Sequence, residues 1–338
     1  MITIKKIAKI ANVSVGTVDR IIHNRGQVTQ ENIDKVNAII KEYGYKKNIF
    51  ASNLAFNKKF RFAVFLPKNS DLEYWESPLL GIEKAEEELK KFGVTLKYYF
   101  YNYNSASFKK MATKLLEQQY DGLLFAPIFY EESILFLNQC KNKEIPIVMI
   151  DSNIKEVDSL AYIGQDAFQS GYLAGRLVSF DSSNRNNVLI IKITREIEST
   201  SVYLQRIKGF YSFFEDHKEF SEINFSEINL KESKKQLNLK MFEGINTIFI
   251  PNSRSYIVAE FLKENGLHSI HIVGYDLLKE NVMYLKEGII NFLINQKPEQ
   301  QGYLGIEHLY KKVVLKENVE KTFYMPLEII VKENYLSV

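Results

Sequence analysis

Residues 4–22 read IKKIAKIANVSVGTVDRII, and they predict two short helices joined by a tight turn. Apolar residues recur within 4–11 at the spacing of one helix face. Thr3 and Ser14 precede the two helices, and their side chains can accept hydrogen bonds from the free amides of a first helical turn. A short helix, a turn at residues 12–13 and a second helix form the geometry that places a helix in the major groove of DNA. The stretch therefore predicts a helix-turn-helix.

A third helix completes a small head. We expect it to begin after Thr29 and to end at Gly44, because Thr favours helix starts and Gly favours helix ends. The apolar side chains available for a small core are Ile7, Ala8, Val13, Val18, Ile21, Ile22, Val28, Ile33, Val36, Ile39 and Ile40. A helical bundle that binds protein instead of DNA is the alternative interpretation of this head.

Positive charge is concentrated at the same end of the chain. Residues 1–61 hold 12 Lys and Arg against 4 Asp and Glu, whereas residues 62–338 hold 32 against 37. A basic segment beside a mildly acidic remainder favours a polyanionic partner for that segment. The distribution agrees with a head that binds double-stranded DNA.

Length and composition bound the rest of the protein. At 338 residues with 46% hydrophobic residues, the chain is too long for one ordinary domain and rich enough in apolar side chains for packed cores. The single cysteine, Cys140, cannot form an internal disulfide and lies in a predicted amphipathic helix. Residues 1–9 lack the apolar run of about 7–15 residues that a signal peptide needs, and no window approaches about 18 consecutive apolar residues. We expect a cytoplasmic protein without a membrane segment.

Beyond residue 61, short apolar runs alternate with amphipathic stretches. The first series predicts strands at 62–66, 94–101, 122–125 and 146–150 and helices at 78–92, 107–119 and 131–141. The second series predicts helices at 168–178, 203–216, 233–242 and 255–265 and strands at 188–193, 224–228, 247–250 and 271–275. Strands that alternate with helices imply parallel sheets covered on both faces. We therefore expect two similar, doubly wound α/β lobes in tandem.

The head resembles the DNA-binding domain of the lac repressor (LacI/GalR) family. The matching features are Ile7-Ala8, Ala11, Val13-Ser14, Thr17-Val18, Arg20, Val28-Thr29, Val36 and Gly44-Tyr45. The resemblance implies that the helix at residues 13–20 enters the major groove. It implies base-edge contacts for Val15, Gly16 and Arg20, and contacts to phosphate or sugar for Ser14, Thr17, His23 and Thr29.

Arg20 is the strongest candidate for reading sequence. A guanidinium can bond O6 and N7 of guanine together, which discriminates by about 1–3 kcal/mol. Val15 and Gly16 offer only apolar or backbone contact, so the operator should differ from operators that polar side chains read at these places. Asp19 stands where the family more usually has Ser, either near phosphates or as a partner within the head.

Residues 48–54, NIFASNL, resemble the hinge helix of the same family. There, two hinge helices lie side by side in a dimer and a Leu enters the minor groove. Leu54 is the matching residue, and Ala51 and Ser52 are small enough for a close approach. An apolar wedge unstacks a base step and bends the DNA. Lys47 stands where the family frequently has a Pro. A helix this short is marginal in water, so we expect the folding of the hinge helix on DNA to be a step at which DNA binding can be controlled.

The rest of the chain resembles, more weakly, the type I periplasmic-binding-protein fold that sugar-sensing repressors share with transport receptors. In such sheets the C-terminal ends of the strands line the ligand cleft. The resemblance implies Tyr74 and Trp75 as aromatics that stack on a sugar, with Asp151, Asn153, Arg195, Arg206, Asn252, Asp276 and Gln296 as polar partners. Carboxylates, amides and a guanidinium suit hydroxyl groups. The alternatives are core packing for Trp75 and helix capping or salt bridges between the lobes for the polar residues.

The resulting organisation has three parts: a helix-turn-helix domain over 1–46, a hinge helix and linker over 47–60, and a ligand-binding and dimerisation domain over 61–338. In the last part, lobe 1 is expected at about 61–165 and 294–322, and lobe 2 at about 166–293 and 323–338. The sequence predicts a homodimer, or a tetramer, that binds operator DNA and a carbohydrate effector. Repressor or activator, inducer or corepressor, and pentose, hexose, polyol or disaccharide all stay open.

Catalysis finds little support in the sequence. The chain has no nucleophile-elbow, phosphate-loop or dinucleotide motif, and its five histidines form no metal-binding pair. We therefore expect no enzymatic activity, no metal and no cofactor. The rival interpretations are a solute-binding receptor of the same fold without a DNA role, and an enzyme of the same architecture.

Overall fold

The computed structural model describes residues 2–22, 28–43, 58–68, 73–180, 187–194, 201–231 and 236–337. It divides into two compact units, Met1–Lys58 and Lys59–Val338. In the described ranges no helix is both long and apolar enough to cross a membrane.

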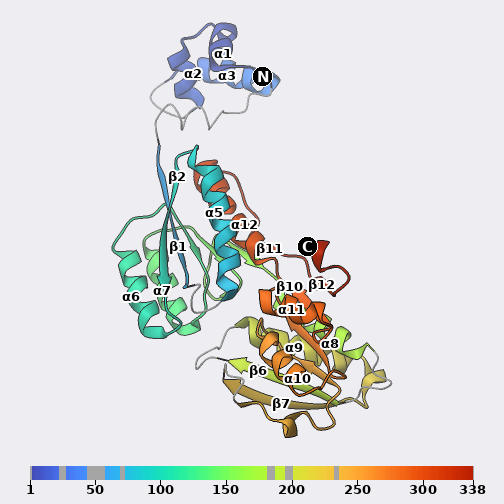
Figure 1. Ribbon diagram of the computed structural model, residues 1–338. Coiled ribbons are helices and arrows are strands. Elements are labelled where there is room, and N and C mark those ends of the chain that lie inside the picture. The colour runs from blue at the N-terminus through green and yellow to red at the C-terminus, as the bar shows by residue number, and fades with distance from the viewer. Residues whose placement is uncertain are drawn as a thin grey trace. The chain divides into compact units, whose positions relative to one another are not determined.

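The first unit is a three-helix head, as predicted (Figure 1). Its helices are α1 (Ile4–Ala11), α2 (Val15–Ile22) and α3 (Gln30–Glu42). The predicted caps form at two of the three helices: the Thr3 hydroxyl accepts from the Lys6 amide and the Ser14 hydroxyl accepts from the Thr17 amide. Thr29 occupies the cap position of α3, but its side chain makes no capping bond. The buried core is Ile7, Ala8, Ala11, Val18, Ile21 and Val36.

The second unit contains two six-stranded sheets with the same strand order. The first, in the order β11-β5-β4-β3-β1-β2, defines lobe 1, and its strands are β1 (Phe60–Pro67), β2 (Val94–Tyr101), β3 (Gly122–Phe125), β4 (Ile147–Ile150), β5 (Ala161–Gly164) and β11 (Thr322–Tyr324). The second, in the order β12-β10-β9-β8-β6-β7, defines lobe 2, and its strands are β6 (Asn187–Thr194), β7 (Asn224–Lys231), β8 (Thr247–Phe249), β9 (His271–Tyr275), β10 (Phe292–Asn295) and β12 (Glu328–Ile330). Neighbours pair in parallel except β10 and β12, which are antiparallel. The two doubly wound lobes are therefore confirmed.

Helices cover both sheets (Figure 1). Lobe 1 carries α5 (Glu76–Lys90), α6 (Ser105–Leu116), α7 (Tyr130–Asn142) and α12 (Pro298–Leu309), and lobe 2 carries α8 (Ala167–Ser179), α9 (Ser201–Asp216), α10 (Ser255–Glu264) and α11 (Lys279–Lys286). Shorter turns of helix are η2 (Glu73–Trp75), η3 (Lys218–Phe220), η5 (Leu239–Phe242), η6 (Tyr310–Val314) and η7 (Tyr335–Ser337). Cys140 lies in α7, a helix predicted at 131–141, and is fully buried.

One predicted helix is wrong. Of the segment 233–242 the structure describes residues 236–242, and these form no α-helix but the short turn η5, because Asn238 adopts an extended backbone that no continuous helix could include. Six further elements were not predicted: β5, β10, β11, β12, α11 and α12. Five of these elements are short: four are strands of three or four residues and α11 is a helix of eight, and their apolar patterns are too brief to stand out.

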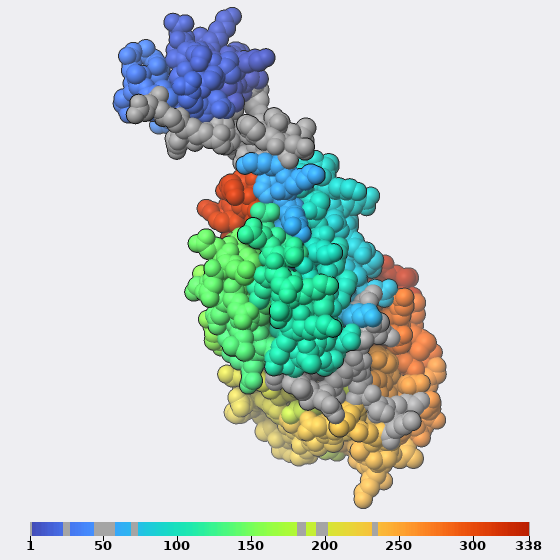
Figure 2. Space-filling model, turned by 90° about the vertical axis from the view of Figure 1, so that its left-hand side faces the viewer, coloured from blue at the N-terminus to red at the C-terminus, as the bar shows by residue number. Residues whose placement is uncertain are grey.

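The chain passes between the lobes at residues 165–166, 296–297 and 325–327, which we call the three crossovers. Figure 2 shows the two lobes in space-filling form, with lobe 1 mainly cyan to green and lobe 2 mainly yellow to orange. Gln165 ties the crossovers together, since its amide group donates to the carbonyls of Asn295 at 2.8 Å and Pro326 at 3.2 Å. The Tyr162 hydroxyl in turn donates to the Gln165 carbonyl at 2.9 Å.

In lobe 1, α5 and α12 touch through two glycines. A Cβ at Gly81 would lie 1.8 Å from the Glu299 carbonyl oxygen, and one at Gly302 would lie 2.1 Å from the Pro78 carbonyl oxygen. Both distances are far below any van der Waals contact. Only glycine allows the two backbones to approach this closely.

Lobe 2 repeats the arrangement with α9 and α8. A Cβ at Gly171 would lie 1.9 Å from the Arg206 carbonyl oxygen, and one at Gly209 would lie 2.0 Å from the Phe168 carbonyl oxygen. In both lobes each helix contributes a glycine and, three residues earlier, a carbonyl. The contact fixes the backbone at Arg206, a predicted site residue, against α8.

Candidate functional site

The exposed face of α2 carries the residues predicted to contact DNA. Val18 and Ile21 are buried in the head, whereas Val15, Gly16 and Arg20 are exposed on the opposite face. Val15 is 45% exposed. The Arg20 guanidinium lies over Gly16, 4.0 Å from where a Cβ would stand.

The N-terminal end of α2 adds two hydroxyls. Ser14 and Thr17 hydrogen-bond through their side-chain oxygens at 2.9 Å, and Ser14 is exposed beside the helix start. Thr29 is exposed before α3. Unpaired amides at a helix start, with hydroxyls beside them, suit a phosphate oxygen. Some predictions lie outside the described residues. They are the hinge helix, the predicted ligand contact Arg195, and four predicted DNA contacts: His23, Ala51, Ser52 and Leu54.

A cavity of about 100 Å³ in the second unit gathers seven of the nine predicted ligand residues. It is lined by Tyr74, Trp75, Tyr103, Ile128, Asp151, Val202, Tyr203, Arg206, Pro251, Asn252, Ser253, Arg254, Asp276 and Gln296. The lining comes from both lobes, at the C-terminal ends of strands such as β4 and β9. This edge is where ligands bind in open α/β sheets.

Asp151 presents the carboxylate of lobe 1. It directly follows β4 in a left-handed backbone conformation, with φ of 64°. Its carboxylate accepts from the Tyr74 hydroxyl and from the Ser152 hydroxyl, each at 2.9 Å. Burial and the nearby carboxylate raise the pKa of Tyr74 well above its usual value, so Tyr74 stays a donor at neutral pH.

Asp276 presents the carboxylate of lobe 2. It directly follows β9, again left-handed with φ of 67°, and is 2% exposed. The Gln296 side-chain amide donates to both carboxylate oxygens, at 3.0 and 2.9 Å. Burial raises the pKa of Asp276 to about 7, although the Arg206 guanidinium and the Gln296 amide act in the opposite direction. The group therefore changes charge near neutral pH.

Arg206 is a buried cation with donors to spare. Its guanidinium carbon lies 3.8 Å from the centre of the Tyr275 ring, and its Nη1 donates to the Pro251 carbonyl at 3.1 Å. Its Nε and Nη2 have no hydrogen-bond partner among the described residues, although Arg206 is only 4% exposed. Buried donors without partners are rare and unfavourable, so these two groups are suited to acceptor atoms of a ligand.

Asn252 and Arg254 shape the wall beside Arg206. The Asn252 side-chain nitrogen donates to the Ile193 carbonyl at 2.6 Å, and its side-chain oxygen accepts from the Arg254 backbone amide. Both ends of the Asn252 side chain therefore bond the protein itself. Arg254 was not predicted, although it follows β8 within the same run PNSR as Asn252. Its Nη1 donates to the same Ile193 carbonyl. Because the C-terminal ends of parallel strands line the cleft, considering all four residues of this run would have predicted Arg254 as well.

The aromatic pair has two roles. Trp75 is 3% exposed and belongs to the core of lobe 1, yet it also lines the cavity. Tyr74 meets Trp75 edge to face with ring centres 5.2 Å apart.

Asn153, also predicted as a ligand contact, does not line this cavity. It lines another cavity of about 310 Å³, together with Gln165 and Asp166.

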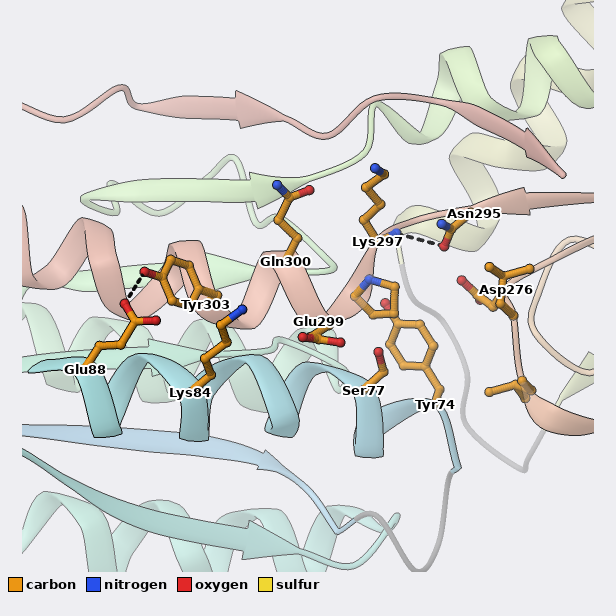
Figure 3. A pocket seen from close by; sticks show the side chains of 13 residues that line it. Tyr74, Ser77, Lys84, Glu88, Asp276, Asn295, Lys297, Glu299, Gln300 and Tyr303 are labelled. Carbon is orange, nitrogen blue, oxygen red and sulfur yellow. Dashed lines mark hydrogen bonds between the residues drawn. The ribbon is translucent and has the colours of Figure 1, made fainter. Parts of the chain in front are cut away.

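A larger cavity of about 590 Å³ adjoins the first (Figure 3). Tyr74 and Asp276 line both, and the rest of the larger wall comes from α5, from α12, and from Leu277, Leu278, Asn295 and Lys297. Two contacts join polar side chains of that wall: the Tyr303 hydroxyl donates to Glu88 at 2.7 Å and the Lys84 ammonium lies over the Tyr303 ring. In the described ranges no cluster of three or more His, Cys, Asp or Glu side chains could hold a metal ion.

Two family profiles match the chain. The one described as "Bacterial regulatory proteins, lacI family" matches residues 3–48, and the one described as "Periplasmic binding protein domain" matches residues 62–317. A LacI-type transcriptional regulator from Bacteroides fragilis, known from its crystal structure, is 31% identical with a TM-score of 0.78 and covers 83% of this chain and 100% of its own.

Curated relatives point the same way. The sucrose operon repressor of Streptococcus mutans is 25% identical over 97% of this chain and 98% of its own length. The transcriptional regulator DegA of Bacillus subtilis is 28% identical over 63% of this chain, and the match spans 61% of DegA. A glucose-galactose binding protein from Geobacillus stearothermophilus, 23% identical with a TM-score of 0.70 over 82% of this chain and 99% of its own, shares the fold of the second unit.

Proposed function

The chain belongs to the lacI family of bacterial regulatory proteins, and from this we propose that it represses transcription by binding an operator through α2, under the control of a carbohydrate effector in the cavity between the lobes. Proteins of this family regulate transcription and are not enzymes. The presence of the lacI-type head also argues against a solute receptor without a DNA role. We propose that the protein acts in the cytoplasm as a homodimer.

The observation that carries the effector proposal is the donor and acceptor set of the 100 Å³ cavity. Arg206 offers two buried N–H groups without partners, and Asp151 and Asp276 offer carboxylate oxygens on the facing walls. A sugar hydroxyl both donates and accepts, so it can bond a carboxylate and a guanidinium together. Tyr74 and Trp75 add aromatic surface for the C–H faces of a sugar ring. The name of the sucrose operon repressor supports the same class of ligand.

Control requires the effector to favour one lobe arrangement. Changing operator occupancy tenfold requires about 1.4 kcal/mol of differential affinity between the two states. One or two hydrogen bonds made in only one arrangement supply that difference. Because the cavity is lined by both lobes, a ligand in it contacts both and can select the angle between them. The hinge segment 47–60 is the proposed route from that angle to the DNA.

The experiment combines an operator search with a ligand screen. The full-length protein is used to select binding sites from random duplexes and from DNA flanking its own gene. A panel of pentoses, hexoses, polyols and disaccharides is then tested for thermal stabilisation and for release of the selected duplex. We expect selection of a pseudo-palindromic site and release of DNA by at least one sugar that also raises the Tm. Equal binding to selected and scrambled duplexes at moderate salt would refute the proposal.

A further inference from the structure

Gln301 lies between the two carboxylates of the cavity without lining it. It is on the first turn of α12, directly after the crossover 296–297, and is 1% exposed. Its side-chain oxygen accepts from the Asp151 amide at 2.9 Å. Its side-chain nitrogen donates to the Gln296 carbonyl at 2.8 Å. Both ends of one buried amide are therefore engaged, one at the end of β4 and one at the crossover.

Gln296 extends this connection into lobe 2. Its own side-chain amide donates to both oxygens of Asp276. A continuous series of hydrogen bonds thus runs from Asp151 through Gln301 and Gln296 to Asp276. It joins the C-terminal end of a lobe 1 strand to the C-terminal end of a lobe 2 strand.

Both ends of the series need support. Asp151 and Asp276 have positive φ, a conformation that residues other than Gly seldom adopt and that costs about 1 kcal/mol or more. The Asp151 amide has two acceptors, the Gln301 side-chain oxygen at 2.9 Å and the Ile163 carbonyl at 3.3 Å, so without Gln301 it keeps only the longer bond. Losing one such hydrogen bond costs about 0.5–1.5 kcal/mol. A glutamine suits the position because one planar group carries both a donor and an acceptor at the required separation.

We propose that Gln301 is a positioning residue of the effector site, which holds the Asp151 backbone and, through Gln296, the Asp276 carboxylate so that both face one ligand. The role of that ligand rests on the proposed function, but the connection itself belongs to the free protein. Its prediction is specific: without Gln301, Gln296 is no longer anchored by its carbonyl and bonds Asp276 less well.

The test follows the Asp276 carboxyl in the full-length, ligand-free protein. Carbon-13 NMR of labelled aspartate, assigned with Asp276→Asn, gives the pKa in the wild type, in Gln301→Met and in Gln300→Met. Gln300 is the exposed neighbour on the same helix and is the matched control.

The charged and titratable groups that face Asp276 stay the same in all the variants compared. They are Arg206 on α9, Asp151 after β4, Tyr74 on η2 and Tyr275 on its own strand.

In Gln301→Met we expect the Asp276 pKa to rise by roughly one unit, because the lost hydrogen bonding favoured the ionised form and one unit corresponds to about one ordinary hydrogen bond. Amide exchange at Asp151 should accelerate by about 2- to 12-fold, because its shorter hydrogen bond is lost while the bond to the Ile163 carbonyl remains. Gln300→Met should change neither quantity. In the double variant Gln296→Met/Gln301→Met the pKa should equal that of Gln296→Met, because the second change acts through the first.

An unchanged Asp276 pKa in a folded Gln301→Met protein would overturn the proposal, as would equal shifts in the Gln300 control. If Gln301→Met does not fold, Gln301→Asn replaces it, since the shorter amide is uncharged but cannot reach both partners together. The same upward shift is then required. None of these measurements involves sugar or DNA, so their failure is distinct from a failure of the proposed function.

Discussion

Asp151 and Asp276 occupy equivalent places in the two lobes. Each follows the strand at the same position of its sheet, β4 and β9, and each has a left-handed backbone with φ of 64° and 67°. Their backbone amides make matching bonds, from Asp151 to the Ile163 carbonyl and from Asp276 to the Ile294 carbonyl, at 3.3 and 3.1 Å. Their surroundings differ, however. Asp151 accepts from hydroxyls, whereas Asp276 lies beside a buried arginine and an amide.

The raised pKa of Asp276 makes the stability of the free protein depend on pH. In the unfolded chain the group ionises near pH 4, whereas in the folded protein burial raises the pKa to about 7. The folded state therefore binds the extra proton between these values, and stability falls as the pH rises through this window, by about 1.4 kcal/mol per unit at most. Asp276→Asn should remove this part of the decline. Thermal melts of both proteins from pH 4.5 to 8 test this, and parallel curves would contradict it.

Arg206→Met should separate stability from effector binding. The substitution removes a buried charge whose Nε and Nη2 lack partners, so we expect the Tm of the free protein to stay within a few degrees of the wild type. Affinity for the sugar found by the screen should fall at least about 100-fold, because two charge-assisted hydrogen bonds are lost. Arg176→Met, on the exposed side of α8, is the control for removing an arginine. Isothermal titration calorimetry measures both, and undiminished binding in Arg206→Met would reject its role.

Gly171→Ala should destabilise lobe 2. A Cβ there would overlap the Arg206 carbonyl, and forcing the helices apart costs about 1–3 kcal/mol or more. Gln169→Ala, an exposed substitution on the same helix, should change stability by less than about 0.5 kcal/mol. Urea unfolding of the full-length proteins gives both values. Equal stability of the two variants would mean that α8 and α9 are not as closely packed as described.

Arg20→Ala should weaken specific DNA binding more than non-specific binding. A bidentate contact to guanine contributes about 1–3 kcal/mol of discrimination, so the affinity for the selected duplex should fall by about 5–150-fold. The slope of affinity against salt should change little, since phosphate contacts are kept. Lys41→Ala, on the exposed last turn of α3, is the control. Fluorescence anisotropy on selected and scrambled duplexes measures the difference; an equal loss on both would assign Arg20 to phosphate.

Local sequence patterns accounted well for the head and the main strands. The periodicity of residues 4–11 and the cap at Ser14 predicted α1 and the start of α2, because short-range chemistry decides both. The segment 233–242 failed for the opposite reason: its apolar residues Leu237 and Phe242 are buried by tertiary packing rather than by helical spacing. β11 and β12, of three residues each, leave no pattern that could be recognised.

Of the residues around the cavity, the sequence predicted mainly those that follow the C-terminal ends of strands. Asp151, Arg206 and Asp276 could be placed because parallel strands bring their C-terminal ends to one edge. Gln301 could not, since its role depends on a helix packing beside a crossover and on the direction of one side chain. No periodicity or composition signals an amide that bonds the backbone both at a strand end of lobe 1 and at a crossover. Asn153, at a strand end as well, follows its loop into another cavity.

Gln165 limits the kind of motion that the effector could drive. Its side-chain amide hydrogen-bonds the backbone at Asn295 and at Pro326, so all three crossovers are joined at one point. Sliding one lobe past the other would break these hydrogen bonds, whereas bending about Gln165 would keep them. A signal from the cavity is therefore expected to travel as a tilt about a fixed pivot, with its largest displacement at the ends of the lobes farthest from Gln165.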